Sequence, residues 1–472
     1  MVTRREKREK EKEINYFFEF LKIKNHFFKE FIHKIKNVKD HRSQSYITYG
    51  AEVLLFTLLL KAMTGLKSMR GMDDAFNKEE CIENVRKALG LETLEELPHY
   101  DTINDFLSGL DVKELEKVRA YMVKELLKKR CFEQFRIEGK YWGVSVDGTG
   151  LHTFQKKHCE HCLKREYVDK ETGETKTIYM HHVLEAKLVV GDMVFSIASE
   201  FIENESEEVT KQDCEMKAFH RLAKKIKETF KRLPICILGD SLYACEPVFS
   251  ICDEHKWKFI CRFKEGRIRS IASEFNTIKE MELGRGQEGI FWVNDISYNK
   301  RTVNLMEWKL DLEDGKSKQY VFITNLKVTK KSEEGLVAAG RSRRKIENQG
   351  FNQQKNIRFN IEHANSHDYT AMKNHYLMVQ IADMIMQLYE KGSSLFKAMK
   401  KTAKEKSSNL LEAIRTRRLT DEDITALAIP IQVRFTWQIH YSKGCDGRKG
   451  VILGISSYIQ TKWNRSVFLA KK

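Results

Sequence analysis

The sequence predicts a mixed α/β protein that is preceded by an all-α N-terminal region. Apolar residues recur at helical spacing through most of the chain up to residue 130. Beyond that point, Trp142 to Gly150 and Ile235 to Asp240 are short strand-like runs, and each carries an aspartate. A basic segment of helical character, Arg341 to Arg358, follows a further group of strand-like runs. Helical spacing and short β-branched runs are the main signals that separate helices from strands.

Composition indicates a large globular chain with a polyanionic partner. The chain has 472 residues, of which 41% are hydrophobic, enough for two or three domains. Lys and Arg total 83 against 67 Asp and Glu, so the net charge is +16. Such an excess favours nucleic acid or an anionic membrane surface. The longest apolar run, Ala51 to Leu60, is interrupted by Glu52 and is too short to span a bilayer, so we expect no transmembrane segment.

The N-terminal residues and the cysteines indicate a cytoplasmic protein. Arg4 to Glu13 is a mixed charge run and lacks the apolar stretch of a secretory signal. The 10 cysteines are mostly scattered singly and do not suggest a disulfide framework. We therefore expect reduced thiols in a reducing compartment, the cytoplasm.

Residues 1–135 are predicted to form a helical, basic, DNA-binding region. Residues 16–35 have the pattern of an amphipathic basic helix, and further helical patterns cover 47–63, 72–90 and 112–130. A short helix is expected after Pro98, capped by Asp101 or Thr102 and ending near Gly109. Helices joined by tight turns are compatible with a helix-turn-helix reader of DNA and equally with a plain helical bundle.

Residues 136–265 are predicted to form the first part of an α/β core. The expected order is a strand carrying Asp147, a hairpin around Gly191-Asp192, a helix over 211–232, a strand ending at Asp240, a helix over 244–255 and a strand over 258–263. Residues 266–328 are strand-like and predict a β-rich insertion. Residues 329–392 should complete the core, with helices over the basic segment and over 369–389, and residues 393–472 form a basic C-terminal region.

Three acidic residues are candidates for binding metal. Asp147 and Asp240 end predicted strands beside glycine, at the edge where α/β sheets bind ligands. Glu347 is the one acid among six basic residues between Arg341 and Arg358. Taken singly, the aspartates could be strand-end residues and Glu347 part of a solvated basic helix. Together they offer three carboxylates to Mg²⁺, and two such ions can promote phosphoryl transfer on a nucleic acid.

These residues resemble the bacterial insertion-sequence transposases, which have an RNase H-like core and an Asp-Asp-Glu triad. The resemblance covers about residues 95 to 390. The separations, 240 − 147 = 93 and 347 − 240 = 107 residues, also fit, because the second leaves room for the insertion. In the cut-and-paste subgroup the glutamate helix carries a tyrosine, an arginine and a lysine at fixed spacing. Arg343 matches the arginine, whereas Gly340 and Gln354 stand at the other two positions and Lys355 is one residue late.

The resemblance implies a DNA transposase that binds element ends, hydrolyses a phosphodiester and transfers a strand to target DNA. It implies Mg²⁺ or Mn²⁺, with two ions held by Asp147, Asp240 and Glu347, and phosphate contacts from Arg343, Arg344 and Lys355. It also implies a homodimer on paired ends. The alternatives are a nuclease that cleaves without joining and a non-catalytic DNA-binding protein derived from such an enzyme. Membrane binding through residues 16–35 is a more distant alternative.

A Cys/His-rich loop is a second candidate site. Two residues separate Cys159 from Cys162 in the chain, and His158, His161 and the pair His181-His182 are nearby. A Cys-x₂-Cys pair with histidine can supply a tetrahedral Zn²⁺ site, although one pair is half a site and a reduced loop without metal is the alternative. Because adjacent strand residues point to opposite faces, at most one of His181 and His182 should take part.

Overall fold

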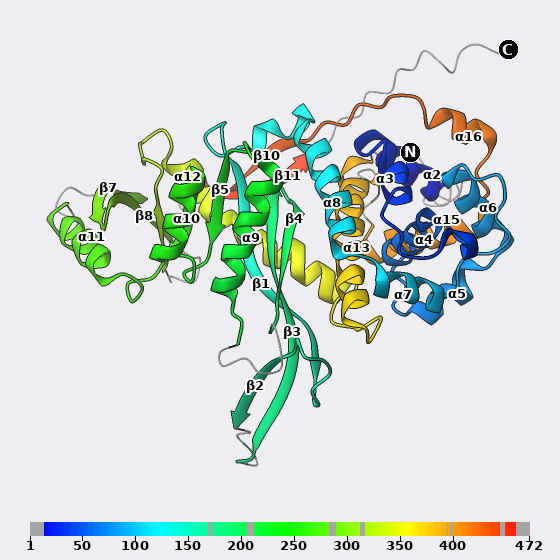
Figure 1. Cartoon of the computed structure of the whole chain (residues 1–472). Coiled ribbons are helices and arrows are strands. Elements are labelled where there is room, and N and C mark those ends of the chain that lie inside the picture. The colour runs from blue at the N-terminus through cyan, green and yellow to red at the C-terminus, as the bar shows by residue number, and fades with distance from the viewer. Residues whose placement is uncertain are drawn as a thin grey trace, which may run out of the picture. The chain divides into compact units, whose positions relative to one another are not determined.

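The computed structural model describes residues 14–168, 171, 173–204, 212–282, 289–311, 317–393, 395–396, 399, 401–443 and 449–458. The charge run Arg4 to Glu13 and the last part of the predicted basic C-terminal region, 459–472, lie outside the described residues. By contacts, the described chain forms two compact units (Figure 1). A helical unit contains the residues up to Cys131 together with Gln353–Thr436, and an α/β unit contains Phe132–Asn352 and Trp437–Ser457.

The α/β unit is built on one large mixed sheet. Within the described residues nine strands form it. Eight follow the order β2-β3-β1-β5-β6-β9-β8-β7, and the ninth, β4, also pairs with β3. The strands are β1 (Trp142–Phe154), β2 (Leu163–Val168), β3 (Thr175–Val190), β4 (Met193–Ile202), β5 (Ile235–Gly239), β6 (Lys258–Phe263), β7 (Ile290–Tyr298), β8 (Arg301–Asp311) and β9 (Ser317–Thr324). This sheet confirms the mixed α/β class expected from the sequence.

The strand directions divide the sheet at β1. Strands β1, β3 and β4 are antiparallel neighbours, and the hairpin between β3 and β4 turns at Gly191 as predicted, with a positive φ of 59° that glycine adopts without strain. Strands β1, β5 and β6 run parallel, and β9 pairs antiparallel to β6. All five residues of β5 are buried, as expected for a continuously apolar strand inside a sheet.

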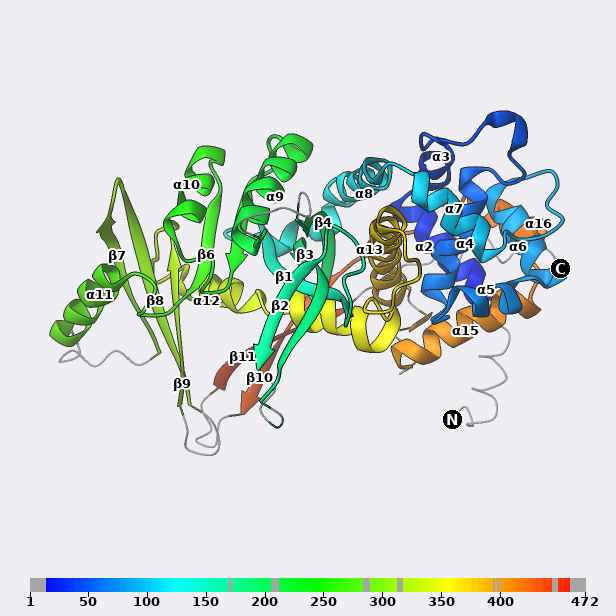
Figure 2. The same cartoon turned by 60° about the horizontal axis from the view of Figure 1, so that its bottom comes forward.

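Helices cover both faces of the sheet, as Figure 2 shows. On one face α9 (Glu215–Phe230) packs on β3 and β4, and α10 (Glu246–His255) packs on β6. On the other face α12 (Glu333–Ser342) packs on β5, β6 and β8. Gly340 permits this close packing, because a Cβ there would lie 2.7 Å from Cδ1 of Phe322. A tyrosine side chain could not occupy this position without displacing Phe322.

The predicted β-rich insertion contains a helix that the sequence analysis missed. Strands β7, β8 and β9 form as expected, but residues 269–282 are helix α11 (Arg269–Glu282), which packs on β7. The strand-like interpretation of this segment was therefore wrong. Ile268, Ile271, Ala272 and Phe275 are all buried, and their spacing is that of one helix face.

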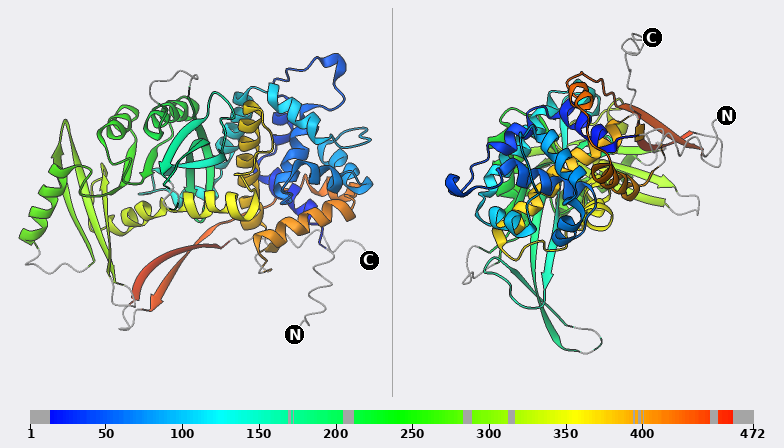
Figure 3. Two further views of the ribbon diagram at one scale, coloured as in Figure 1. Left: turned by 90° about the horizontal axis from the view of Figure 1, so that it is seen from below. Right: turned by 90° about the vertical axis from the view of Figure 1, so that its right-hand side faces the viewer.

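The helical unit is organised around one long helix. Its helices are α2 (Tyr16–Phe27), α3 (Phe31–Lys36), η1 (Gln44–Tyr46), α4 (Ala51–Met63), α5 (Met69–Phe76), α6 (Glu79–Leu89), α7 (Tyr100–Gly109), α8 (Val112–Leu127), η5 (Gln353–Arg358), α13 (Tyr369–Gly392), α15 (Ala403–Thr416) and α16 (Asp421–Ala426). Helix α13 packs against α2, α4, α7 and α8, and Figure 3 shows it in gold beside the blue N-terminal helices. A short 3₁₀ helix, η2 (Arg130–Phe135), crosses the boundary in sequence, and β10 (Thr436–Lys443) pairs with β11 (Lys449–Tyr458). Among the described helices, none is both long enough and apolar enough to cross a bilayer.

The segment 16–35 differs from the single amphipathic helix that the sequence predicted. Helix α2 ends at Phe27 and α3 begins at Phe31, so the helix is interrupted. An amphipathic basic helix should expose its lysines, but Lys24 is only 3% exposed. Burial lowers the pKa of Lys24 to about 8. The reason is that a charged ammonium loses hydration when it is enclosed by apolar side chains.

We expect Lys24→Met to stabilise the helical unit. The pKa falls from 10.5 in the unfolded chain to about 8 in the folded unit, and at neutral pH this shift costs about 3 kcal/mol. Between these two pKa values the unfolded chain binds the extra proton, so wild-type stability should rise with pH across this window. The variant should lack that rise. Denaturant titrations at several pH values would measure the free energy of unfolding, with Lys29→Met at an exposed position as the control. Equal stability and equal pH dependence of the two variants would contradict the prediction.

Candidate functional site

Asp147 and Asp240 lie at the same level of two adjacent parallel strands. The pairing of β1 with β5 runs from Trp142 opposite Ile235 to Ser145 opposite Leu238, an offset of 93 residues that also separates Asp147 from Asp240. Neighbouring strands lie about 4.8 Å apart. Asp240 directly follows β5, as predicted, but the prediction that Asp147 ends a strand was wrong, because β1 continues to Phe154 and stays paired with β3. The two carboxylates are still close enough for the charge of Asp240 to act on Asp147.

A tight turn after β5 fixes the position of Asp240. Strand β5 ends at Gly239, and the Asp240 carboxylate accepts a hydrogen bond of 2.7 Å from the backbone N–H of Leu242. The Tyr243 N–H donates to the carbonyl of Asp240 at 3.2 Å. A Cβ at Gly239 would lie 2.6 Å from Cβ of Tyr243, so only glycine allows this turn. The backbone of the turn that follows Asp240 therefore fixes the position of its side chain.

Arg343 contacts the first aspartate directly. Its Nη2 lies 2.9 Å from Oδ2 of Asp147, and both side chains are about one-fifth exposed, at 19% and 20%. The Ser145 hydroxyl donates to the carbonyl of Arg343 at 3.1 Å, which holds the end of α12 against β1. The resemblance implied that Arg343 contacts phosphate, and in the structure its guanidinium balances the charge of Asp147.

Glu347 lies on a π-helix that packs against the sheet. Helix α12 is followed by η4 (Ile346–Phe351), which has π-helical hydrogen bonding and packs against β1 and β4. Lys345, just before it, donates to the carbonyl of Gly191 at 2.5 Å and to Asp192 at 3.1 Å. Glu347 itself is exposed. π-helical turns are rare and often occur at functional sites.

The acids interact electrostatically around Asp147. Burial raises the pKa of Asp147 to about 6, Arg343 opposes the rise, and the negative charges of Glu215, Asp240 and Glu347 add to it. All three predicted acids therefore influence one another. Among the described residues, however, the carboxylate oxygens of the three do not all lie within 4.8 Å of one another. Repulsion between the negatively charged carboxylates opposes a closer approach. Arg343 also contacts the Asp147 carboxylate and takes up space beside it.

The sequence analysis missed a fourth acid, Glu215, at the first residue of α9. The Tyr243 hydroxyl donates to Oε1 of Glu215 at 2.5 Å. Burial is the largest cause of the raised pKa of Glu215, and Asp240 contributes. A Cβ at Gly148 would lie 3.0 Å from Oε2 of Glu215, so the glycine after Asp147 makes room for this carboxylate. In the sequence, the only signals for this contact were Gly148 and Tyr243, and neither indicates that its neighbour in the fold is Glu215.

The other predicted phosphate contacts have different surroundings. Arg344 is exposed, with its guanidinium 5.3 Å from the centre of the Tyr320 ring. Lys355 belongs to η5 in the helical unit and forms an ion pair of 2.8 Å with Glu362. Gln354, at the position where the transposase pattern has lysine, is fully buried and donates to Asp383 at 2.7 Å. A lysine at that buried position would have the same acidic partner.

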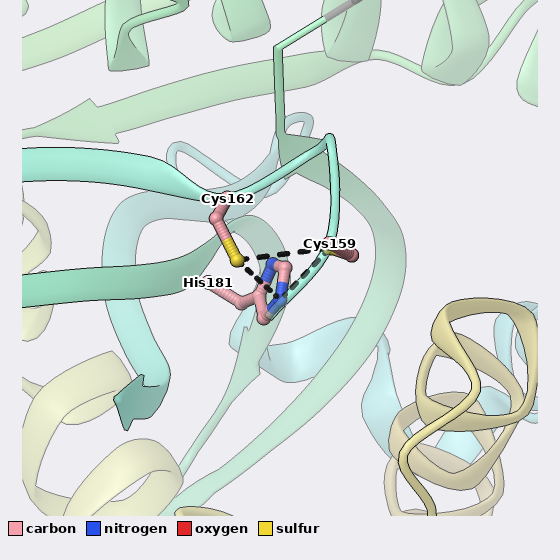
Figure 4. A group of neighbouring side chains, drawn as sticks. All are labelled: Cys159, Cys162 and His181. Atoms are coloured by element: carbon pink, nitrogen blue, oxygen red, sulfur yellow. Dashed lines mark hydrogen bonds between the residues drawn. The ribbon is translucent and has the colours of Figure 1, made fainter. Parts of the chain in front are cut away.

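The Cys/His loop forms a second cluster in the α/β unit (Figure 4). Sγ of Cys159 lies 3.7 Å from Sγ of Cys162, and each sulfur lies 3.5 Å from Nε2 of His181. Burial and the neighbouring Cys162 thiol raise the pKa of the Cys159 thiol to about 11. His182 does not belong to the cluster, as expected from strand geometry, since His182 lies toward Gly150. The structure thus adds His181 to the two cysteines named from the sequence.

The comparisons with known proteins give a match to one family and matches to solved structures. Residues 32–122, in the helical unit, match the family described as DDE_Tnp_1-associated. No curated protein matches the chain. The chain is also similar to a solved structure, the cryo-EM structure of the piggyBac transposase synaptic complex with hairpin DNA. That similarity has a TM-score of 0.41 and 10% identity, and covers 92% of this chain and 88% of that chain.

Proposed function

We propose that this chain is a DNA transposase that binds the ends of its own element, hydrolyses a phosphodiester and joins the freed end to target DNA. The observation that carries the proposal is the convergence of Asp147, Asp240 and Glu347. Asp147 lies on β1, and Asp240 directly follows β5, the adjacent parallel strand. The π-helix that carries Glu347 packs against β1. The match of residues 32–122 to a family described as associated with DDE_Tnp_1 supports the same proposal.

The strand order supports an RNase H-like core. Along the sheet, β4, β3 and β1 are consecutive antiparallel neighbours, and β5 and β6 follow in parallel with β1. The order of elements along the chain also agrees with the resemblance to insertion-sequence transposases, since the strand with Asp147, a hairpin and a helix precede the strand that leads to Asp240. Strands β7 to β9 lie between the strand that leads to Asp240 and the helix that leads to Glu347, where the β-rich insertion was expected.

The acidic residues suit a hard divalent cation. Asp147, Asp240 and Glu347 offer carboxylate oxygens to such an ion. Burial and, to a smaller extent, the neighbouring acids raise the pKa of Asp147, and a bound cation would relieve the repulsion between these acids. Together they would hold Mg²⁺ or Mn²⁺, two ions in all. Such ions supply positive charge that favours the attacking oxygen and the leaving oxygen of a phosphodiester.

The chain's own basic residues would orient the DNA backbone. Arg343 holds the Asp147 carboxylate and adds positive charge beside the acids. Arg344 presents an exposed guanidinium one residue further on, and Lys355 follows in the next π-helix. Guanidinium groups match phosphate geometry, and the net charge of +16 adds affinity that does not depend on sequence. A homodimer on paired ends would allow both ends to be processed together.

A cleavage and joining assay with the DNA that flanks this gene tests the proposal. With the full chain and Mg²⁺, we expect nicks at the element ends and, with a pre-cut end, covalent joining to a target plasmid. Cleavage without joining would indicate an RNase H-like nuclease instead. A mobility shift with neither reaction, in Mg²⁺ and in Mn²⁺, would indicate a non-catalytic DNA-binding protein derived from a transposase. Either result would overturn the proposal.

A further inference from the structure

We propose that Cys159, Cys162 and His181 bind one Zn²⁺ ion, which fixes the loop between β1 and β2 to strand β3. The site does not depend on the proposed transposase activity. It lies in the α/β unit, where β3 extends beyond β4 and pairs with β2 (Figure 1). We call this projecting pair, residues 163–168 and 175–180, the arm.

The distances within the cluster are those of a tetrahedral zinc site. Zinc lies about 2.3 Å from thiolate sulfur and about 2.0–2.1 Å from imidazole nitrogen, so a tetrahedron requires about 3.8 Å between two sulfurs and about 3.5 Å between sulfur and nitrogen. The observed separations are 3.7 Å between the sulfurs and 3.5 Å from each sulfur to Nε2 of His181. These three groups can therefore bind one ion without moving, and the remaining coordination position falls to a ligand outside the group.

The loop that carries the cysteines is already held in place. The Cys162 N–H donates to the carbonyl of Cys159 at 3.3 Å, which closes a tight turn. Asn204, which follows β4 and is 7% exposed, donates through its side chain to the Cys162 carbonyl at 2.9 Å. The carbonyl of Asn204 lies 3.0 Å from Nδ1 of His161. A preformed turn of this kind lowers the ordering cost of metal binding.

The chemistry of the three groups favours zinc over the alternatives. Two thiols and one imidazole are soft or borderline ligands, which suit Zn²⁺ and do not suit Mg²⁺ or Ca²⁺. A disulfide requires the sulfurs to approach about 2.05 Å, well inside the observed separation of 3.7 Å. Cys162 and His181 are 3% and 1% exposed. Such burial is typical of a structural ion rather than a substrate site.

The position of the cluster suggests what the ion does. His181 lies opposite His152 of β1, and Leu163, next to Cys162, lies opposite Met180. The ion would therefore join the end of β1, the start of β2 and the middle of β3 at the base of the arm. Glu185, the partner of Asp147 in the ladder, lies four residues further along β3, about 13 Å away. The ion would be separate from the carboxylate cluster.

Metal analysis of the full chain, purified without a metal-chelating resin, tests the proposal. We expect one zinc per chain, and X-ray absorption should show two sulfurs at about 2.3 Å and nitrogen at about 2.0–2.1 Å. Cys159→Ser/Cys162→Ser and His181→Ala should lose the zinc. Two matched controls should retain it: His182→Ala, on the opposite face of the same strand, and Cys214→Ser, an exposed cysteine.

A second measurement keeps the test decisive if the cysteine variants fold poorly. Removal of zinc from the wild-type chain with a chelator should increase amide hydrogen exchange in residues 152–168 and leave β5 and β6 protected, and added zinc should reverse the change. Wild-type protein that is folded but free of zinc, zinc that persists in the double cysteine variant, iron in its place or a Cys159–Cys162 disulfide would each overturn the proposal.

Discussion

Asp240→Asn should reduce Mg²⁺-dependent DNA cleavage by on the order of a thousand-fold while DNA binding stays at the wild-type level. Asparagine keeps the oxygen that accepts the hydrogen bond from Leu242 N–H, so the turn after β5 should persist. What disappears is one negative charge beside Asp147. Metal-dependent stabilisation of charge is worth several kcal/mol, and each 1.4 kcal/mol corresponds to about a tenfold change in rate.

Glu347→Gln should reduce cleavage by a similar factor, because it also removes one of the three proposed metal-binding carboxylates. The side chain of Glu347 is exposed, so the substitution should have little effect on stability. The matched control is Glu254→Gln on α10 of the same unit, whose carboxylate is also exposed, with 74% of its side-chain surface accessible. Cleavage would be followed on labelled end DNA over a range of Mg²⁺ concentrations, and binding by mobility shift. Activity of either variant close to that of the control would contradict the triad.

Glu215 provides a finer comparison within the same experiment. It lies near Asp147 and Asp240 but was found only in the structure, where Tyr243 holds it. If Glu215→Gln loses activity as fully as Asp240→Asn, the site uses four acids rather than three. If the loss is modest, Glu215 adjusts only the electrostatic field around Asp147.

The sequence predicted the elements that carry Asp147 and Asp240 because their signals are local. Val144 and Val146 on β1 and all of β5 are buried, and uninterrupted apolar runs of this length are strands in a covered sheet. The β1–β5 register itself pairs residues that are 93 positions apart in the chain and was not predicted from the sequence. The hairpin at Gly191 was predictable for a similar reason, since a glycine-containing turn separates two strand patterns.

Other features depend on contacts between distant parts of the chain. Whether a lysine in a helix faces solvent depends on its neighbours in space, so Lys24 looked solvated in the sequence and is buried in the unit. Glu215 and Tyr243 are separated by 28 residues, and no local pattern indicates their hydrogen bond. His181 joins Cys159 and Cys162 only through the pairing of β3 with β1 and β2. The sequence left His158, His161 and at most one of His181 and His182 as candidate ligands, and could not choose among them.

A buried ion cluster in the helical unit carries the second large effect. Arg358, on η5, lies 2.7 Å from Oε2 of Glu390 and 3.5 Å from Oδ1 of Asp383, both on α13. The three side chains are 9%, 5% and 2% exposed. Without Arg358, the nearest cation to Glu390 would be Lys406, whose Nζ is 3.8 Å from Oε2. Removing one member of a buried ion pair costs about 3–5 kcal/mol, because the remaining charge is poorly compensated. Exposed ion pairs are worth about 0–1 kcal/mol.

Arg358→Ala should therefore lower the free energy of unfolding of the helical unit by about 3–5 kcal/mol, measured by denaturant titration with far-UV circular dichroism. Lys355→Ala is the matched control on the same π-helix, because its ion pair with Glu362 is more open to water, and it should cost about 1 kcal/mol or less. Adding Glu390→Gln to Arg358→Ala removes the carboxylate that has lost its nearest cation and should restore part of the loss. Equal unfolding midpoints for Arg358→Ala and Lys355→Ala would mean that water reaches this cluster. Restoration by Glu390→Gln, in contrast, would assign the loss to buried charge rather than to the missing arginine side-chain packing.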